Sequence, residues 1–257
     1  MKNILITNDD GFDSPALEAL IDSLQGIARI LVVAPASEKS ACGHGLTLTK
    51  PLRFIKVKDD FYKLDNGTPA DCIYLALNTM YETKPDLIIS GINIGSNMGE
   101  DVTYSGTIAG AMEGAIREIP SIALSQVLND KNDAFSFDFS LAKEVSKEIV
   151  EKILNGTFPL KGRKLLNINI PQIKQKDYKG IKITQLGYRL YGNDAHLHRN
   201  PRGQEYYWLG LHPLAWRERE GNNSDFKATF EGYTSITPIL LDLTSYDDMN
   251  MLTNWIK

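Results

Sequence analysis

The sequence predicts an α/β protein built on a Rossmann-like, doubly wound and mostly parallel sheet. Short apolar runs alternate with segments of helical periodicity over residues 1–171, which is the order expected when helices connect parallel strands. The runs are continuously apolar, as in strands that are buried on both faces. With 257 residues, 42% of them apolar and 23% charged, the composition is that of a folded protein, so disorder and collagen-like structure are excluded.

The first strand, helix and second strand are predicted within the first 35 residues. Residues 3–7 form the apolar run NILIT, which ends at the turn-forming sequence NDDG at 8–11. In the helix that follows, Ser14 is a suitable N-cap and Pro15 suits the first helical position. A second buried strand is expected over 28–34, where a proline stops it. A strand, helix and strand in this order form a parallel pair with a right-handed crossover.

The same alternation continues to residue 171. The expected elements are a hairpin over 52–57 and 62–64, a helix opening at 68–71, a strand over 86–90, a helix over 107–118, a strand over 121–125, a helix over 139–154 and a strand over 164–170. Thr68 and Asp71 have the spacing of a capping box with an acidic third position, so we interpret Asp71 as a structural carboxylate.

The region after residue 171 differs in character, since residues 172–235 are rich in aromatic residues and turn formers. We expect strands over 181–186, 205–209 and 234–239, and an amphipathic helix over 244–256. The predicted division is therefore an α/β catalytic core over 1–171 and an extended β arm with a closing strand and a tail helix over 172–257, the two being structurally part of one domain. The aromatic residues of the arm suit a base-binding pocket, a subunit contact or the core of a β layer.

The charge balance and the cysteines limit which binding partners and which cellular compartment are expected. The chain has 28 basic and 32 acidic residues and a net charge of -4, so nothing favours a nucleic-acid polymer as a stable partner. Its two cysteines, Cys42 and Cys72, lack the spacing of a zinc site and are expected to be reduced. No apolar stretch approaches the roughly 20 residues of a membrane span, and the N-terminus lacks the features of a signal peptide. We expect a cytoplasmic protein without a membrane partner.

Polar side chains follow the first three predicted parallel strands, where ligands bind in open α/β sheets. Asp9 and Asp10 end the first strand, and two ionised carboxylates at that position would repel each other and resist desolvation unless a cation were present. The same residues also suit a turn that caps the next helix. Ser40 and Asn93, which follow the next two strands, would complete an all-oxygen site suited to Mg²⁺, Mn²⁺ or Ca²⁺.

A possible anion site precedes the helix expected over 107–118. Backbone N–H groups at a helix start carry positive partial charge, so the Ser105-Gly106-Thr107 turn can hold a phosphate. On this segment alone, an ordinary Ser/Thr N-cap is the favoured interpretation of the same residues. His44 can approach a substrate from the loop after the second strand, whereas His196, His198 and His212 fall in the arm. For all four histidines we favour surface or packing roles.

Two enzyme classes are disfavoured by spacing. A phosphatase that forms an aspartyl phosphate needs an Asp-x-Asp pair whose side chains point the same way, and the NDDG sequence at 8–11 does not supply it. A dinucleotide-dependent oxidoreductase needs Gly-x-Gly-x-x-Gly after the first strand, and none is present.

The assembled motifs resemble the SurE survival proteins, a family of metal-dependent phosphatases of nucleoside monophosphates. The matching strings are ILITNDDG at 4–11, VVAP at 32–35 with Ser40 following, GTPAD at 67–71, SGIN at 90–93, GSNMG at 95–99, YSGTIAGAMEGA at 104–115 and GYTSITPI at 232–239. They occur in order over the first half of the chain, with one further stretch near its end. The loop CGHG at 42–45 and residues 126–231 offer little to compare.

The resemblance implies a ligand set, an assembly and an activity. It implies that Asp9, Asp10, Ser40 and Asn93 bind one divalent cation per subunit, and that Asn97, Ser105, Gly106 and Thr107 hold the phosphate. It also implies that the C-terminal arm is exchanged between subunits of a homodimer or homotetramer. The corresponding hypothesis is hydrolysis of nucleoside 5′-monophosphates, and also 3′-monophosphates, with Asp9 or Asp10 accepting a proton from water. The alternative is a nucleotide-binding or stress-survival module that uses the same site without hydrolysis.

Overall fold

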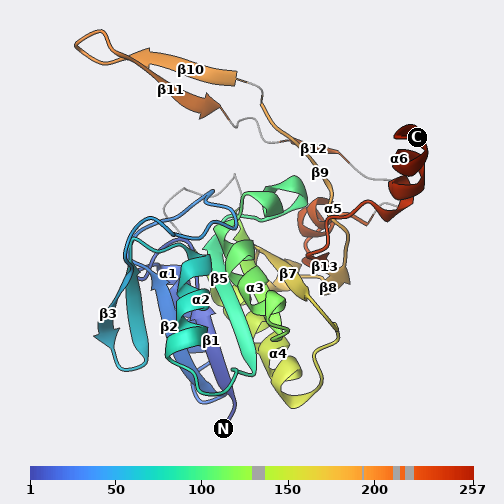
Figure 1. Ribbon diagram of the computed structural model, residues 1–257. Helices are drawn as coiled ribbons and strands as arrows, with labels where there is room; N and C mark the ends of the chain where they lie inside the picture. Colours follow the sequence, from blue (N-terminus) through green and yellow to red (C-terminus); the bar gives the residue numbers. More distant parts are fainter. Residues whose placement is uncertain (129–136, 193, 211–214, 218–222) are drawn as a thin grey trace.

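The fold is organised around one sheet of nine strands, seen in a computed structural model that describes residues 1–128, 137–192, 194–210, 215–217 and 223–257 (Figure 1). The strand order is β3-β4-β2-β1-β5-β6-β7-β13-β8. The elements up to residue 171 are β1 (Asn3–Thr7), α1 (Pro15–Ser23), β2 (Arg29–Pro35), β3 (Arg53–Lys58), β4 (Phe61–Asp65), α2 (Pro69–Thr79), β5 (Leu87–Ile94), η1 (Gly99–Thr103), α3 (Gly106–Ile116), β6 (Ser121–Val127), α4 (Ser140–Asn155) and β7 (Lys164–Pro171).

The remaining elements lie between residue 175 and the C-terminus. They are η2 (Gln175–Asp177), β8 (Ile181–Ile183), β9 (Tyr188–Leu190), β10 (Asp194–Arg199), β11 (Glu205–Gly210), β12 (Ala215–Arg217), α5 (Asp225–Phe230), β13 (Thr234–Leu240), η3 (Tyr246–Asp248) and α6 (Met249–Trp255). The predicted Rossmann-like α/β class is confirmed, and the strands and helices up to residue 171 form close to their expected positions.

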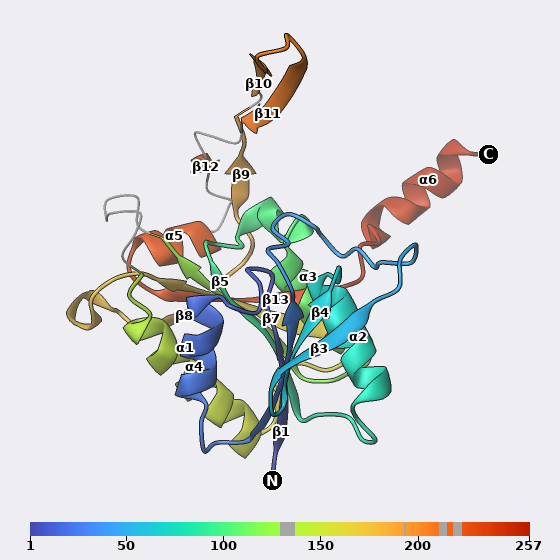
Figure 2. The ribbon, with the colours of Figure 1, turned by 90° about the vertical axis from the view of Figure 1, so that its left-hand side faces the viewer.

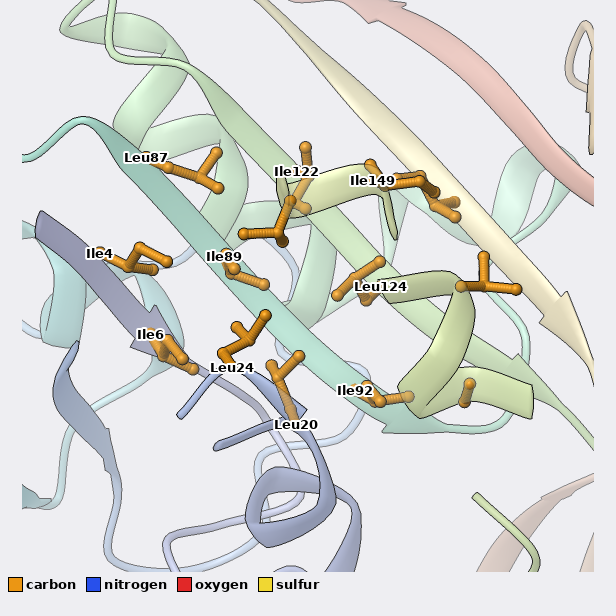
Figure 3. Packing of buried hydrophobic residues seen from close by; sticks show 14 of the residues in the cluster. Ile4, Ile6, Leu20, Leu24, Leu87, Ile89, Ile92, Ile122, Leu124 and Ile149 are labelled. Atoms are coloured by element: carbon orange, nitrogen blue, oxygen red, sulfur yellow. The ribbon is translucent and has the colours of Figure 1, made fainter. Parts of the chain in front are cut away.

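Helices cover both faces of the sheet, with α1 and α4 on one face and α2 and α3 on the other (Figure 2). The apolar side chains of the parallel strands alternate between these faces, since Ile4 and Ile6 of β1 lie in the cluster with α1, whereas Leu5 packs with α2. In the first cluster Leu20 of α1 and Ile89 of β5 are fully buried (Figure 3). Each such side chain stabilises the fold by roughly 1.5–3 kcal/mol. This double burial explains why the strands are continuously apolar.

The strand order places the expected ligand residues at one edge. β1 pairs in parallel with β2 on one side and with β5 on the other, so the chain changes direction across the sheet at β1. In doubly wound sheets such a switch point opens a crevice beyond the carboxyl ends of the strands. The loops that follow β1, β2 and β5 therefore meet there.

The C-terminal part contains both expected and unexpected elements. β13 is the expected closing strand and lies between β7, to which it is antiparallel, and β8, to which it is parallel. α5 forms where the arm was expected to be β structure, because Ser224 caps it by accepting a hydrogen bond from the Lys227 N–H. The expected tail helix over 244–256 is shorter, with η3 preceding α6. The division at residue 171 stays a prediction, although β8 and β13 extend the same sheet.

The hairpin of β10 and β11 and the tail helix α6 extend away from the sheet and its helices (Figures 1 and 2). Both carry exposed apolar side chains, which include Trp208 and Leu209 on the hairpin and Trp255 and Ile256 at the tail. Within the described residues, none of the helices has the length and apolar character needed to cross a bilayer.

Two capping predictions had different outcomes. Thr68 and Asp71 form the expected capping box, because the Thr68 side chain accepts the Asp71 N–H and the Asp71 carboxylate accepts the Thr68 N–H. Ser14 occupies the N-cap position of α1, but its side chain makes no capping hydrogen bond, so that prediction was wrong in its detail. The Ser14 backbone carbonyl accepts the Glu18 N–H instead.

Candidate active site

The Asp9 side chain connects the end of β1 to the start of α3. Asp9 is only 4% exposed, and both of its carboxylate oxygens accept hydrogen bonds from Thr107. The Thr107 hydroxyl donates to Oδ1 at 2.6 Å and the Thr107 N–H donates to Oδ2 at 3.1 Å. A carboxylate at a helix N-terminus is favoured by the partial positive charge there. The structure thus brings together one predicted metal ligand and one predicted phosphate ligand.

Asp10 faces the end of β5. The Ile94 N–H donates to Asp10 Oδ2 at 3.0 Å, which places this carboxylate beside the loop that contains Asn93. Asp10 Oδ1 receives no hydrogen bond from any residue in the described part of the chain. Asp10 therefore keeps one carboxylate oxygen available, whereas Asp9 has both oxygens engaged.

The electrostatics of this pair favour a cation. Burial raises the pKa of Asp9 above its ordinary value, although the hydrogen bonds from Thr107 oppose that change. Burial, together with the charges of Asp9 and Glu38, raises the pKa of Asp10 to about 7 against the opposing hydrogen bond from Ile94. Both raised pKa values mean that the anionic carboxylates are poorly stabilised by protein groups alone. A positive ion at this position would remove that cost.

The loop after β2 approaches the same point, but with its hydroxyl turned to another partner. The Lys39 N–H donates to the Asp9 carbonyl at 2.7 Å, which attaches the loop to the end of β1. Ser40 is exposed, and its hydroxyl donates to Glu38 Oε1 at 2.7 Å. Glu38 was not predicted as a site residue, although it lies two positions before Ser40 and its charge acts on both aspartates.

Asn93 lies at the end of β5, immediately before the residue that donates to Asp10. Its Nδ2 donates to the Gly95 carbonyl at 2.8 Å, so its Oδ1 is the atom left to serve as a ligand. Gly91 allows β5 to approach β6 closely, because a Cβ atom there would lie 2.2 Å from the Leu124 carbonyl oxygen. A side chain at Gly91 would therefore displace the strand that carries Asn93.

The start of α3 has features both of an ordinary N-cap and of an anion site, the two interpretations made from the sequence. Ser105 is an N-cap, since its hydroxyl accepts the Ile108 N–H at 3.0 Å. The Gly106 N–H, in contrast, finds no acceptor among the residues that the structure describes, so it is free to bind an anion. A Cβ atom at Gly106 would lie 2.9 Å from Asp9 Cβ and 2.9 Å from Cys42 Sγ, so this close approach needs glycine.

Asn97 lies in a buried polar network that was not predicted. Its Nδ2 donates to the Ser125 hydroxyl at 2.8 Å, and its backbone N–H donates to Asn169 Oδ1 at 2.9 Å. Its backbone carbonyl accepts from Nδ2 of Asn167 at 2.8 Å and from Nδ2 of Asn169 at 3.0 Å. The sequence signal was present in the polar residues at alternate positions of NIN within the apolar run of β7.

His44 and His198 have packing or surface positions in the described part of the chain. His44 Nε2 is 2.8 Å from Oε1 of Glu113, a buried residue of α3 whose other carboxylate oxygen binds Arg117. His198 stacks on Tyr206 within the hairpin. His212 lies outside the described residues. Asp71 caps α2 as expected, and it also accepts the Thr47 N–H.

No group of three or more histidine, cysteine, aspartate or glutamate side chains within metal-binding reach occurs in the described ranges. The predicted ligand set differs from such a group, because it contains two carboxylates, a hydroxyl and an amide. Mg²⁺ is commonly bound through one or two carboxylates with several waters retained, so a set of this composition suits a hard divalent ion.

These features define a class of protein. The chain is a doubly wound α/β protein with two adjacent carboxylates at its switch point and a helix N-terminus beside them. The model of the family described as "Survival protein SurE" matches residues 4–193. The chain belongs to the SurE family, and the resemblance found in the sequence motifs is confirmed.

Relatives of the same family match over the full length. The 5'-nucleotidase SurE of Helicobacter hepaticus is 66% identical, and that of Wolinella succinogenes is 68% identical, each over 100% of both chains. The crystal structure of the SurE protein from Aquifex aeolicus, which is 40% identical, matches with a TM-score of 0.82 and covers 99% of this chain and 100% of that chain. The fold, including its C-terminal part, is therefore shared with a solved member of the family.

Proposed function

We propose that this chain is a 5′-nucleotidase, a metal-dependent phosphatase that hydrolyses nucleoside 5′-monophosphates to nucleoside and phosphate. The names of the relatives that match it over the full length support this activity. The observation that carries it is the contact of buried Asp9, next to Asp10, with the N-terminus of α3. This arrangement supports a cation site beside an anion site, as hydrolysis of a phosphomonoester requires. Nucleoside 3′-monophosphates are further candidate substrates.

One divalent cation per subunit fits the residues present. Asp9, Asp10, Ser40 and Asn93 would hold it, and their oxygen atoms suit Mg²⁺ or Mn²⁺, with Ca²⁺ as a further candidate. The raised pKa values of the two aspartates support a cation at this point, because burial and the charges of neighbouring carboxylates disfavour their anionic forms. Ser40 would exchange its hydrogen bond to Glu38 for the ion. When bound, such an ion supplies polarisation of a phosphoryl oxygen and a lowered pKa of water.

The phosphate would be held by Asn97, Ser105, Gly106 and Thr107. The free Gly106 N–H and the positive end of α3 favour the charge that develops on the phosphoryl oxygens. Thr107 donates both of its hydrogen bonds to Asp9 and so orients that carboxylate, and it would exchange one of these bonds to contact the phosphate. The anion site therefore needs few side chains, because the backbone of the helix start supplies much of the potential.

The two aspartates are the proposed catalytic residues. Water forms the new bond to phosphorus, the ester bond to the nucleoside oxygen breaks, and the proton released by water is accepted by a carboxylate. Asp10 is the better acceptor of this proton, because its Oδ1 has no donor within the described chain, whereas Thr107 occupies both oxygens of Asp9. The leaving oxygen takes up a proton to give the nucleoside hydroxyl.

Assembly and location complete the proposal. We expect a homodimer or homotetramer in which residues 172–257 are exchanged between subunits. The exposed apolar side chains of the hairpin and α6, such as Trp208 and Trp255, support this assembly because the described residues of one subunit leave them largely uncovered. A cytoplasmic location is supported by the free thiols of Cys42 and Cys72. A nucleic-acid polymer and a membrane are not among the proposed partners.

A phosphate-release assay separates the enzyme from the alternative, a binding or stress-survival module that does not hydrolyse its ligand. The purified chain is incubated with a panel of nucleoside monophosphates and Mn²⁺ or Mg²⁺, before and after addition of a chelator. We expect release that the chelator abolishes and that added metal restores. Tight nucleotide binding without any phosphate release would favour the module and overturn the proposed activity.

A further inference from the structure

Four polar residues form a buried network beside the carboxyl ends of β6 and β7. Ser125, Asn167 and Asn169 are fully buried, and Asn97 is 7% exposed. Every side chain in this group has a hydrogen-bond partner within it, including the contact of 3.3 Å between Asn169 Nδ2 and Asn167 Oδ1. Burying amides and a hydroxyl away from water is costly unless they are paired. A network of this kind therefore calls for a specific structural role.

The network holds one residue, Asn97, at three points. Asn169 accepts its backbone N–H and donates to its backbone carbonyl, and Asn167 donates to the same carbonyl. Ser125 binds its side-chain amide. The backbone N–H, the backbone carbonyl and the side chain of Asn97 are thus all held by residues on strands of the sheet.

The strands that supply these contacts also pack against α3, the helix that begins at the proposed phosphate site. Ser125 and Asn169 are paired in register on β6 and β7. Ala123 lies on the same face of β6 as Ser125 and belongs to the same buried apolar cluster as Ile108 and Ala111 of α3. The network thus lies on the face covered by α3, the helix whose first residues form the proposed anion site.

The Ser125 hydroxyl accepts one of the two side-chain N–H groups of Asn97, at 2.8 Å, and this fixes the orientation of the amide. The second N–H of Nδ2 has no acceptor among the described residues. It is therefore available to a phosphoryl oxygen. Removing the hydroxyl would leave the amide free to rotate without a preferred orientation.

We propose that Ser125 and Asn169, assisted by Asn167, are positioning residues that hold Asn97 for the phosphate group of the nucleotide. The inference rests on the proposed function for the identity of the ligand. Asn169 and Asn167 set the backbone of Asn97, and Ser125 sets its side chain. None of the three residues needs to touch the substrate.

The test compares Ser125→Ala with Ser121→Ala. Ser121 lies on the same strand and the same face, is also fully buried, and donates to the Ile119 carbonyl at 2.8 Å, so it matches the loss of one buried hydroxyl at the other end of β6. Melting temperatures establish that both variants fold. KM and kcat are measured for a nucleoside monophosphate, and Kd for inorganic phosphate is measured by calorimetry in the presence of Mn²⁺.

We expect Ser125→Ala to raise KM and the Kd for inorganic phosphate by about tenfold, as for one lost hydrogen bond to a charged group, with kcat nearly unchanged. Ser121→Ala should leave all three values unchanged. In an Asn97→Ala background, Ser125→Ala should have no further effect, because its influence acts through Asn97. If the Asn169→Ala variant folds, it should also raise KM and the Kd for inorganic phosphate. If it does not fold, the result for Ser125→Ala alone tests the proposal.

Two results overturn the inference. One is equal behaviour of Ser125→Ala and Ser121→Ala, and the other is an effect of Ser125→Ala that is as large in the Asn97→Ala background as in the unmodified chain. If the unmodified chain hydrolyses no nucleotide, the proposed function fails, but the phosphate-binding comparison still decides the role of Ser125. Absence of phosphate binding by the unmodified chain would overturn both.

Discussion

The candidate site at the end of β1 and the C-terminal hairpin with α6 contrast sharply in what they bury. The candidate site buries polar groups, such as Asp9 and Asn97, and satisfies them with hydrogen bonds from neighbouring strands and α3. The hairpin and α6 instead expose large apolar groups, among them Trp208 and Trp255. Buried polar groups are costly without a ligand or partner, and exposed apolar groups are costly without a covering surface. The first region thus satisfies its polar groups within one subunit, whereas the second presents the apolar surface that the proposed contact between subunits would cover.

The largest expected effect is at Asp9. Asp9→Asn should reduce turnover by about a thousandfold or more, because it removes a carboxylate from the proposed cation site and from the contact with Thr107. The control is Asp71→Asn, which alters another buried carboxylate that caps α2. The control should lower stability by about 1 kcal/mol and keep most of the activity. Phosphate release and thermal melting measure both, and an active Asp9→Asn variant would contradict the proposed centre.

Gly106→Ala should have the next largest effect. The added Cβ would meet Asp9 Cβ and Cys42 Sγ at 2.9 Å, so one of the two must move. A displacement of the proposed catalytic carboxylate by up to about 1 Å would lower kcat/KM by up to about a hundredfold. Adding Cys42→Ala removes one of the two clashing atoms and should restore part of the activity. If Gly106→Ala has full activity, the close packing of α3 against Asp9 has no functional role.

A smaller effect on stability is expected at Glu113, which joins His44 of the loop after β2 to α3. Burial on its own raises the pKa of Glu113, but the hydrogen bonds and charges of His44 and Arg117 outweigh it, so the pKa is lowered from its ordinary value of 4.5. Because the folded pKa lies below the unfolded one, this stabilisation is fully present above pH 4.5 and is lost as the pH falls through the folded value.

Glu113→Gln should therefore lower the free energy of unfolding at pH 7 by about 1–3 kcal/mol and flatten its dependence on pH below 4.5. Denaturant unfolding at several pH values measures both. Glu231→Gln is the matched control in the C-terminal region, because it breaks the more exposed ion pair with Lys182 and should change stability little. Equal losses in the two variants would remove the contrast between the buried and the exposed region.

The smallest expected effect on the site comes from the hairpin. Replacing Trp208 and Leu209 by serine should shift the molar mass of the assembly to a lighter species, since both side chains are largely exposed within one subunit. Turnover per subunit should change by less than about threefold, because no residue of the proposed site lies on the hairpin. Light scattering with a parallel activity assay makes the measurement, and Arg202→Ala at the exposed hairpin tip is the control. An unchanged mass would contradict the proposed exchange of the arm.

The sequence by itself determined the order of strands and helices up to residue 171 and the polar residues that end β1, β2 and β5. These features depend on patterns of a few residues, such as the apolar run before Asp9 or the capping box at Thr68. The predicted phosphate role of Thr107 rested on the same kind of local signal. It could not reveal that Thr107 donates to Asp9, because the two residues are 98 positions apart.

Only the tertiary structure decided the contacts that join distant segments. The buried Asp225 accepts the Gly99 N–H across 126 positions, and Asn169 binds Asn97 across 72. α5 and the place of β13 between β7 and β8 were set in the same way, by surfaces that form once the core has folded. Local propensity acts over the few residues of one turn or strand, whereas these pairings gain their free energy from the burial and mutual satisfaction of groups that the chain brings together only on folding.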